Sequence, residues 1–250
     1  MKTYQERTYR QHFDNERWRG FVCQYKDTDV WIGVDKASYH KNMPDFTTKF
    51  ITALWDIMND YLLQDPVFAA TLKPHIRIGT MPYMAVKMSE ASHQAGVGPM
   101  AAVAGAFAAA LGQTVKQQFD AKEIIVENGG DIYVDLVEDI DVAVFAGESP
   151  LSEKIGLHID AKKSPLGICT SSGTVGHSLS FGKADAVMII CNDALLADAY
   201  ATAFANQIQT ADDIDRLTET IGRTSNILGA LLVKDDKMGI VGEFEMKLFH

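Results

Sequence analysis

The sequence predicts an α+β protein in which strands and helices fold as one unit over residues 1–250. Short segments rich in aromatic and β-branched residues alternate with longer segments whose apolar residues recur at helical spacing. No low-complexity tract, linker or charge block divides the chain. With 250 residues, 47% of them apolar, the chain is large enough to bury a full hydrophobic core.

The first quarter of the chain predicts a β-hairpin followed by a long helix. Residues 17–25 and 29–35 are rich in aromatic and β-branched residues, and a short polar turn separates them. Residues 44–66 carry apolar side chains along one helical face. Pro44 lies at the start of this segment and Pro66 after its end, which are positions where proline favours the limits of a helix.

The remainder of the chain predicts helices before and after a run of strands. Two helices are expected over residues 82–94 and 95–113. Two more are expected over residues 193–207, with Asn192 as the N-cap, and 212–223, before two or three closing strands. The strands expected between these helices span residues 123–128, 131–136, 141–147, 154–160, 166–170 and 184–191.

The charge and composition exclude several classes of function. The chain has 33 acidic and 23 basic residues, a net charge of −10 and no basic run, so general nucleic-acid binding is not expected. The N-terminal segment lacks the apolar stretch of a secretory signal, and no run of about 18 apolar residues predicts a membrane span. The three cysteines have no C-x-x-C spacing, which favours neither a disulfide framework nor a zinc site. A cytoplasmic protein is expected.

A carboxylate and a hydroxyl group share one face of the helix expected over residues 193–207. Asp198 and Thr202 lie four residues apart, so their oxygen atoms point the same way. Oxygen ligands of this kind suit Mg²⁺, which usually keeps water molecules and binds one or two carboxylates together with phosphate groups. The alternative is that this face of the helix is solvated, since aspartate is seldom buried without a partner.

Two glycine-containing turns are candidate ligand-binding loops. Gly129-Gly130-Asp131 joins two expected strands, and its glycines allow positive φ and a close approach of the backbone to a ligand. Residues 169–177, CTSSGTVGH, end another strand and can turn successive N–H groups toward an anion. The alternative for the first segment is an ordinary hairpin turn closed by the aspartate.

The second loop also contains groups that can take part in catalysis. His177 can act as a general base or can be an ordinary polar loop residue, and the sequence does not decide between the two. A serine hydrolase built on Ser171 or Ser172 is a weaker alternative, because no G-x-S-x-G motif surrounds either serine. Lys183 is the cation close by in the sequence and can meet a phosphate group.

A third segment resembles a dinucleotide-binding motif in its glycine spacing. Residues 96–101, GVGPMA, match the pattern G-x-G-x-x-A. The segment before them reads as a helix, so the strand that a Rossmann site requires is absent and such a site is not expected. A smaller role remains, because Pro99 in the first turn of the next helix leaves free N–H groups near Gly98 for an anion.

Four motifs, taken together, resemble the ApbE-like superfamily, whose best-known members are flavin transferases, and more closely a cytoplasmic branch of it. The motifs are VGPMAAVAGAFA, VENGGDIYV, TSSGTVGHSLSFGKADAV and ADAYATAFAN, which follow one another over most of the chain. The resemblance implies an α+β fold in which helices pack on mixed or antiparallel sheets.

The resemblance also implies a site for Mg²⁺ and FAD. The metal-binding aspartate and threonine of the family fall on Asp198 and Thr202. In the transferases, FMN is moved from FAD onto a threonine hydroxyl of an acceptor protein, so a dinucleotide and a protein acceptor are the expected partners. His177 is the expected catalytic residue. The residues expected to contact the dinucleotide are Gly98, Asn128, Gly129, Gly130, Asp131, Thr170, Ser171, Ser172, Gly173 and Lys183.

Two departures from the transferase pattern keep two functions open. The helix before the N-x-G-G-D-I turn lacks the Lys-Gly pair, and VGHSLSFGKAD replaces the H-x-x-D-P-x-T-G segment. The first function is a Mg²⁺-dependent FMN transferase or FAD pyrophosphate-cleaving enzyme. The second is a flavin- or nucleotide-binding module that has lost catalysis. The sequence leaves homo-oligomer formation open.

Overall fold

An eight-stranded antiparallel sheet forms the centre of the protein. The computed structural model describes residues 17–75, 79–175 and 181–249. The strands of the sheet are β1 (Trp18–Tyr25), β2 (Thr28–Asp35), β3 (Ile124–Asn128), β4 (Asp131–Asp135), β7 (Leu166–Ser171), β8 (Ala186–Cys191), β9 (Gly229–Lys234) and β10 (Lys237–Gly242). They lie side by side in this order, and every neighbouring pair is antiparallel.

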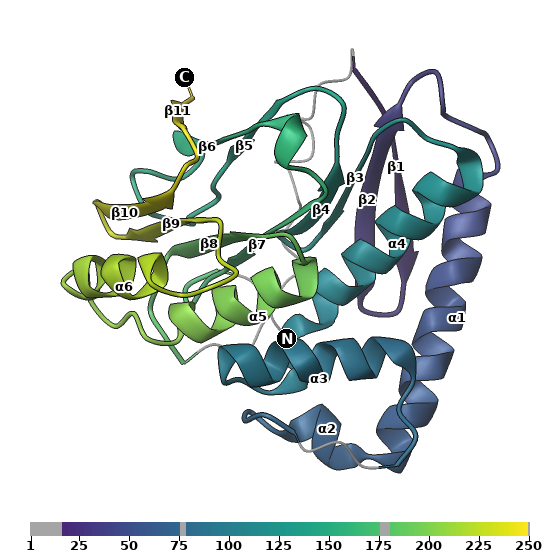
Figure 1. Cartoon of the computed structure of the whole chain (residues 1–250), viewed down its shortest axis with the longest axis horizontal. Helices are drawn as coiled ribbons and strands as arrows, with labels where there is room; N and C mark the ends of the chain where they lie inside the picture. Colours follow the sequence, from purple (N-terminus) through teal and green to yellow (C-terminus); the bar gives the residue numbers. More distant parts are fainter. Residues whose placement is uncertain (1–16, 76–78, 176–180, 250) are drawn as a thin grey trace.

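Helices cover one face of this sheet, and a small second sheet lies on the other (Figure 1). The small sheet has the order β11-β6-β5. Its strands are β5 (Ile140–Ala143), β6 (Ile155–Ile159) and β11 (Met246–Leu248). The helices are α1 (Met43–Gln64), α2 (Pro66–Ala70), α3 (Tyr83–Ala95), α4 (Val103–Phe119), α5 (Ala194–Ala205) and α6 (Asp213–Gly222), with short 3₁₀ segments η2 (Pro99–Ala102) and η3 (Ala161–Lys163).

The two faces of the large sheet carry separate hydrophobic cores. Successive residues of a strand point to opposite faces, so in β3 Ile124 and Val126 pack among the helices, whereas Ile125 packs toward the small sheet. The side chains of these three residues are almost completely buried. Burial on both faces explains why β8 is apolar throughout and why β3 and β7 each begin with a run of residues that are not polar, in place of an alternating pattern.

The structure confirms the predicted α+β class and corrects three details. The helix expected over residues 95–113 is divided into η2 and α4, and α4 continues to Phe119, which is partly buried against the core beneath the helices. The short helix α2 was not predicted, since five residues carry too little periodicity. The N-cap of α5 is Asp193, whose side chain accepts a hydrogen bond from the Leu195 N–H, and the prediction of Asn192 is wrong.

The helices do not include an obvious membrane span. Across the ranges that the structure describes, no single helix is long and apolar enough to cross a membrane. Helix α3 and the η2–α4 segment meet that criterion only as a pair, which is bent by 104°. Much of the apolar surface of α4 is buried inside the protein.

Candidate functional site

A row of three side chains crosses the sheet on its helical face. In the strand register, Asn128 at the end of β3 pairs with Asp131 at the start of β4, and Asp131 pairs with Cys169 of β7. Directly paired residues point to the same face of a sheet, and Cys169 belongs to the core beneath the helices. Asp131 is therefore a carboxylate under the helices, with only 8% of its surface exposed.

Helices α4 and α5 make their closest contact at Gly105. The Gly105 N–H donates a 2.8 Å hydrogen bond to Oδ2 of Asp198 on α5. A Cβ atom at position 105 would lie 2.3 Å from the carbonyl oxygen of Ala194, so only glycine fits here. The N–H of Ala104 also hydrogen-bonds to the Asp198 carboxylate. Asp198 therefore satisfies free N–H groups in the first turn of α4, where a negative charge is favoured.

The two aspartates place uncompensated negative charge inside the protein. Burial raises the pKa of Asp198 to about 7, although hydrogen bonds from the Gly105 and Ala104 N–H groups oppose the shift. Burial also raises the pKa of Asp131 well above its ordinary value, and the charges of Asp198 and Glu127 raise it further. Among the residues that the structure describes, neither aspartate forms an ion pair with a basic side chain. A proton or a cation would relieve this repulsion.

The Gly-Gly-Asp turn lies beside the carboxylates and has the conformation that its glycines allow. Gly129 and Gly130 have φ of +70° and +101°. The Gly130 N–H donates a 2.8 Å hydrogen bond to Oε1 of Glu127, and the Gly130 carbonyl accepts a 3.2 Å hydrogen bond from the Thr170 N–H. The turn is thus joined to the end of β7, so the two loops predicted from the sequence lie together.

Asn128 and Thr202 extend this cluster on either side. The Asn128 side-chain amide donates a 3.1 Å hydrogen bond to the Ala104 carbonyl, which fixes the start of α4 over the sheet. Thr202 is half-buried on α5, one turn after Asp198. The predicted hydroxyl and carboxylate therefore do share one helix, and that helix is buried at Asp198, so the solvated alternative is wrong for this residue.

The Thr-Ser-Ser-Gly loop (residues 170–173) is held by its own hydrogen bonds. Ser172 Oγ accepts a 2.9 Å hydrogen bond from the Val175 N–H and donates a 3.2 Å bond to the Ala184 carbonyl. The same carbonyl accepts a 2.8 Å bond from the Gly173 N–H. The Ser172 hydroxyl stabilises the loop, an arrangement that does not favour it as the nucleophile of a hydrolase.

Three other predicted residues lie farther from the carboxylates or outside the described part. Gly98 contacts the backbone at Thr71, where a Cβ atom would lie 1.9 Å from the Thr71 carbonyl oxygen. Lys183 is exposed, and its N–H donates a 2.7 Å hydrogen bond to the Ile208 carbonyl beyond the C-terminal end of α5. His177 lies outside the residues that the structure describes.

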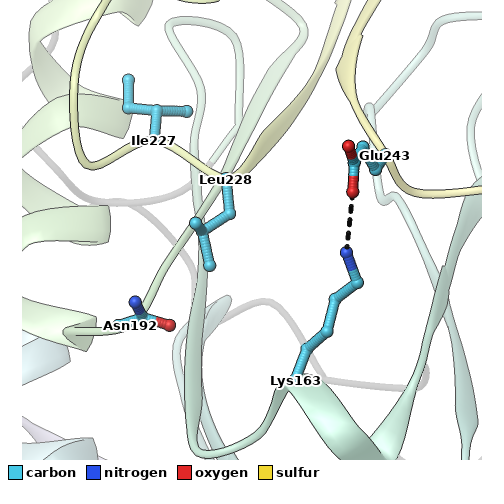
Figure 2. Close-up of a pocket in the computed structure, with 5 residues that line it drawn as sticks. All are labelled: Lys163, Asn192, Ile227, Leu228 and Glu243. Atoms are coloured by element: carbon cyan, nitrogen blue, oxygen red, sulfur yellow. Dashed lines mark hydrogen bonds and ion pairs between the residues drawn. The ribbon is translucent and has the colours of Figure 1, made fainter.

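A pocket of about 410 Å³ lies elsewhere in the molecule (Figure 2). It is lined by Lys163, Asn192, Ile227, Leu228 and Glu243. Figure 2 shows the ion pair between the Lys163 ammonium and the Glu243 carboxylate, which are 3.5 Å apart. Asn192 follows the end of β8 that is remote from the Thr-Ser-Ser-Gly loop. The pocket contains none of the predicted site residues, so we place the candidate site at the carboxylates.

The oxygen atoms around Asp198 fit a magnesium ion better than a softer metal. Within the described ranges, no group of three or more histidine, cysteine, aspartate or glutamate side chains is arranged to hold a metal ion. Mg²⁺ needs fewer protein ligands, because it keeps several water molecules and binds one or two carboxylates. Asp131 and Asp198 are two such carboxylates, and a cation would offset the repulsion between them.

Comparison with known proteins gives the family. The chain matches the family described as AbpE bacteria over residues 10–238. It belongs to that family. A UPF0280 protein of Methanospirillum hungatei is 44% identical over 171 residues, which cover 68% of this chain and 69% of the relative. A UPF0280 protein of Methanocaldococcus jannaschii is 34% identical over 223 residues, covering 87% of this chain and 88% of the relative.

Solved structures of ApbE proteins share the fold. The apo flavinyl transferase ApbE of Pseudomonas stutzeri superposes with a TM-score of 0.59 and 10% identity, covering 90% of this chain and 94% of that one. The ApbE protein of Thermotoga maritima gives a TM-score of 0.52 and 13% identity, covering 92% of this chain and 96% of that one. The predicted membership of the ApbE-like superfamily is confirmed.

Sequence reasoning missed three residues that shape the candidate site. Gly105 allows α4 to contact α5, and Cys169 lies directly beside Asp131 in the sheet. Glu127 binds the Gly130 N–H from the opposite face of the sheet. A signal was present for Cys169, because it directly precedes the Thr-Ser-Ser-Gly loop at the end of an expected strand. No local pattern distinguishes Gly105 from the other small residues of its helix.

Proposed function

We propose that the protein is a Mg²⁺-dependent flavin-nucleotide-handling protein that binds FAD beside Asp131 and Asp198. The proposed reaction is transfer of FMN to an acceptor protein or cleavage of the FAD pyrophosphate. The observation that carries the proposal is the pair of buried carboxylates without a basic partner in the described residues. They lie next to the Gly129–Gly130 turn, whose positive φ lets a ligand approach the backbone, and this turn is joined to the Thr-Ser-Ser-Gly loop. The superfamily, in which the Pseudomonas stutzeri protein is a flavinyl transferase, supports flavin as the ligand.

Each residue has a defined part in this proposal. Mg²⁺ would be held by Asp198, Asp131 and the Thr202 hydroxyl, and would offset the negative charge of a pyrophosphate. The Gly129–Gly130 turn would allow the ligand to approach the backbone closely. The Gly105 N–H holds the Asp198 carboxylate in place, so that the metal ligand does not have to be ordered on binding.

Calorimetric titration with FAD, with and without Mg²⁺, tests the proposal. We expect FAD binding that depends on Mg²⁺. Asp198→Asn keeps an oxygen that accepts the Gly105 hydrogen bond but removes the charge, so we expect Mg²⁺-dependent affinity to fall at least about 100-fold. Asp65→Asn is the matched control, because Asp65 is equally buried but lies at the α1–α2 junction and pairs with His75.

The readouts separate the two forms of the proposal. Release of AMP from FAD, which chromatography detects, would identify an enzyme. An acceptor protein that becomes labelled with FMN would identify a transferase. Binding of FAD without AMP release identifies the binding module, which the missing lysine in the first turn of α4 favours. If the affinity for FAD changes neither with Mg²⁺ nor in Asp198→Asn, the carboxylates are not the metal site.

A further inference from the structure

Asp185 is a buried carboxylate that no function assigned above uses. It lies directly before β8, and only 7% of its surface is exposed. Its Oδ1 accepts a 3.0 Å hydrogen bond from the hydroxyl of Thr174, and its Oδ2 accepts a 2.6 Å hydrogen bond from the N–H of Asp235. One carboxylate therefore joins the residue after the Thr-Ser-Ser-Gly loop to the turn between β9 and β10.

A positive charge compensates this carboxylate, in contrast to the pair at Asp131 and Asp198. Lys234 Nζ lies 3.5 Å from Asp185 Oδ2 and 2.6 Å from Asp235 Oδ1. The hydrogen bond to Asp235 raises the pKa of Lys234, the charge of Asp185 adds to that shift, and burial opposes it. Asp185 therefore accepts its two hydrogen bonds beside an ammonium group.

The turn to which Asp185 is attached is itself held to the rest of the fold. Ser149 Oγ donates a 2.6 Å hydrogen bond to the Asp235 carbonyl. The turn joins β9 and β10, which are paired along their full lengths. Asp185 therefore connects the loop to a fixed part of the sheet.

The loop is attached to the sheet at two places. The Ser172 hydroxyl and the Gly173 N–H both donate to the Ala184 carbonyl just before β8, and Asp185 provides the attachment to the β9–β10 turn. Ser172 Oγ accepts hydrogen bonds from the N–H groups of Thr174 and Val175, which shapes the loop but does not attach it to β9 or β10. Gly173 packs against the backbone at Gly182, where a Cβ atom would lie 2.0 Å from the carbonyl oxygen. The Thr174 hydroxyl links the loop through Asp185 to the sheet.

We propose that Asp185 is a positioning residue, which holds the Thr-Ser-Ser-Gly loop through the Thr174 hydroxyl in the conformation that binds the ligand. The proposal rests on the proposed function, since it assumes that this loop contacts the nucleotide. A loop ordered before binding loses less conformational entropy when the ligand arrives. Releasing the loop should therefore weaken nucleotide binding more than it lowers the stability of the protein.

The test compares Thr174→Val with Thr174→Ser. Valine has the shape of threonine but cannot donate to Asp185, whereas serine restores the hydroxyl. We expect amide hydrogen exchange at Gly173 and Val175 to become about tenfold faster in ligand-free Thr174→Val, as for loss of a hydrogen bond to a charged group. Affinity for FAD with Mg²⁺ should fall by a similar factor, and Thr174→Ser should restore both to the wild-type values. Urea unfolding of each variant measures any change in overall stability.

The outcomes separate this proposal from the proposed function. Unchanged exchange in Thr174→Val would show that Asp185 does not hold the loop. Faster exchange with unchanged FAD affinity would show that the loop does not position the nucleotide, and loss of affinity in proportion to a loss of stability would show a structural role only. If the wild-type protein binds no FAD with Mg²⁺, the proposed function fails, and the ligand-positioning role fails with it, whatever the exchange rates show.

Discussion

Two regions of this protein bury aspartate in opposite ways. At the α1–α2 junction, Asp65 Oδ2 lies 2.7 Å from Nε2 of His75 and accepts a 3.1 Å hydrogen bond from the Tyr61 hydroxyl. Its Oδ1 accepts a 3.1 Å bond from the Phe68 N–H, as the N-cap of α2. At the crossing of α4 and α5, Asp131 and Asp198 face each other's charge with no basic side chain from the described residues beside them.

The difference shows in the direction of the pKa shifts. Burial by itself would raise the pKa of Asp65, but the hydrogen bonds from His75, Phe68 and Tyr61 lower it. The pKa values of Asp131 and Asp198 remain raised, because burial and like charge exceed the contribution of their hydrogen bonds. Burial alone therefore does not identify a functional carboxylate in this fold, whereas burial without compensation does suggest one.

The largest effect is expected from breaking the compensated site. Asp65→Ala removes the partner of His75 and Tyr61 and the N-cap of α2, so we expect the free energy of unfolding to fall by about 3–5 kcal/mol. Asp65→Asn keeps an acceptor for the Phe68 N–H, so we expect a smaller loss in the free energy of unfolding. Urea unfolding followed by circular dichroism measures both, and equal stability of wild type and Asp65→Ala would show that this network does not stabilise the fold.

The uncompensated site predicts a pH dependence of stability in metal-free buffer. Between the ordinary pKa of 3.8 and about 7, folded Asp198 holds a proton that the unfolded chain has lost. Stability should therefore fall as the pH rises through this window, by up to about 1.4 kcal/mol per pH unit for one carboxyl group. The raised pKa of Asp131 acts in the same direction.

The lowered pKa of Asp65 acts in the opposite direction and at lower pH, where stability is lost as the pH falls through the folded pKa. Urea unfolding from about pH 5 to about pH 8 therefore reports the pair at the helix crossing together with His158, whose pKa is raised by the hydrogen bond with Asp141, and the difference between wild type and Asp198→Asn gives the part that belongs to the pair. Asp198→Asn should flatten this dependence, and so should added Mg²⁺, whereas Asp65→Asn should leave it unchanged. If stability still falls with rising pH in Asp198→Asn, groups other than Asp198 cause the pH dependence.

A change of intermediate size tests the helix crossing. Gly105→Ala forces a Cβ atom against the Ala194 carbonyl, so we expect a loss of about 1–3 kcal/mol together with weaker Mg²⁺ binding. Gly112→Ala is the control on the same helix, because its Cβ atom would lie 2.2 Å from the Tyr133 ring and should lower stability without affecting the metal. Equal effects of the two variants on Mg²⁺ affinity would contradict a role of Gly105 in holding Asp198.

The smallest effect concerns a buried hydroxyl group with neither charge nor partner. Among the buried side chains of the described residues, Thr47 Oγ1 on α1 lacks a hydrogen bond. Thr47→Val replaces it with a methyl group of the same shape, so the protein should be unchanged or more stable by about 1 kcal/mol. A loss of more than that, measured by thermal unfolding, would indicate that the hydroxyl has a partner after all.

Sequence reasoning predicted the elements better than the contacts between them. The strands and the helices with proline or glycine at their limits lie close to their predicted ranges, because local periodicity determines them. Asp131 and Asp198 were expected in one site from the motifs and the family resemblance taken together, but their direct approach depends on the register of β3, β4 and β7 and on how closely α4 approaches α5. Neither is encoded in a short window of residues. The predicted roles of His177 and Lys183 remain predictions.

The small sheet on the second face has a consequence for synthesis of the chain. Its strands β5 and β6 lie between residues 140 and 159, but β11, which pairs with β6, follows at residues 246–248. The large sheet, by contrast, adds its strands in the order in which they are made. During translation, one edge of β6 therefore stays unpaired until β11, about 90 residues downstream, has been made, and an unpaired strand edge is open to pairing with other chains.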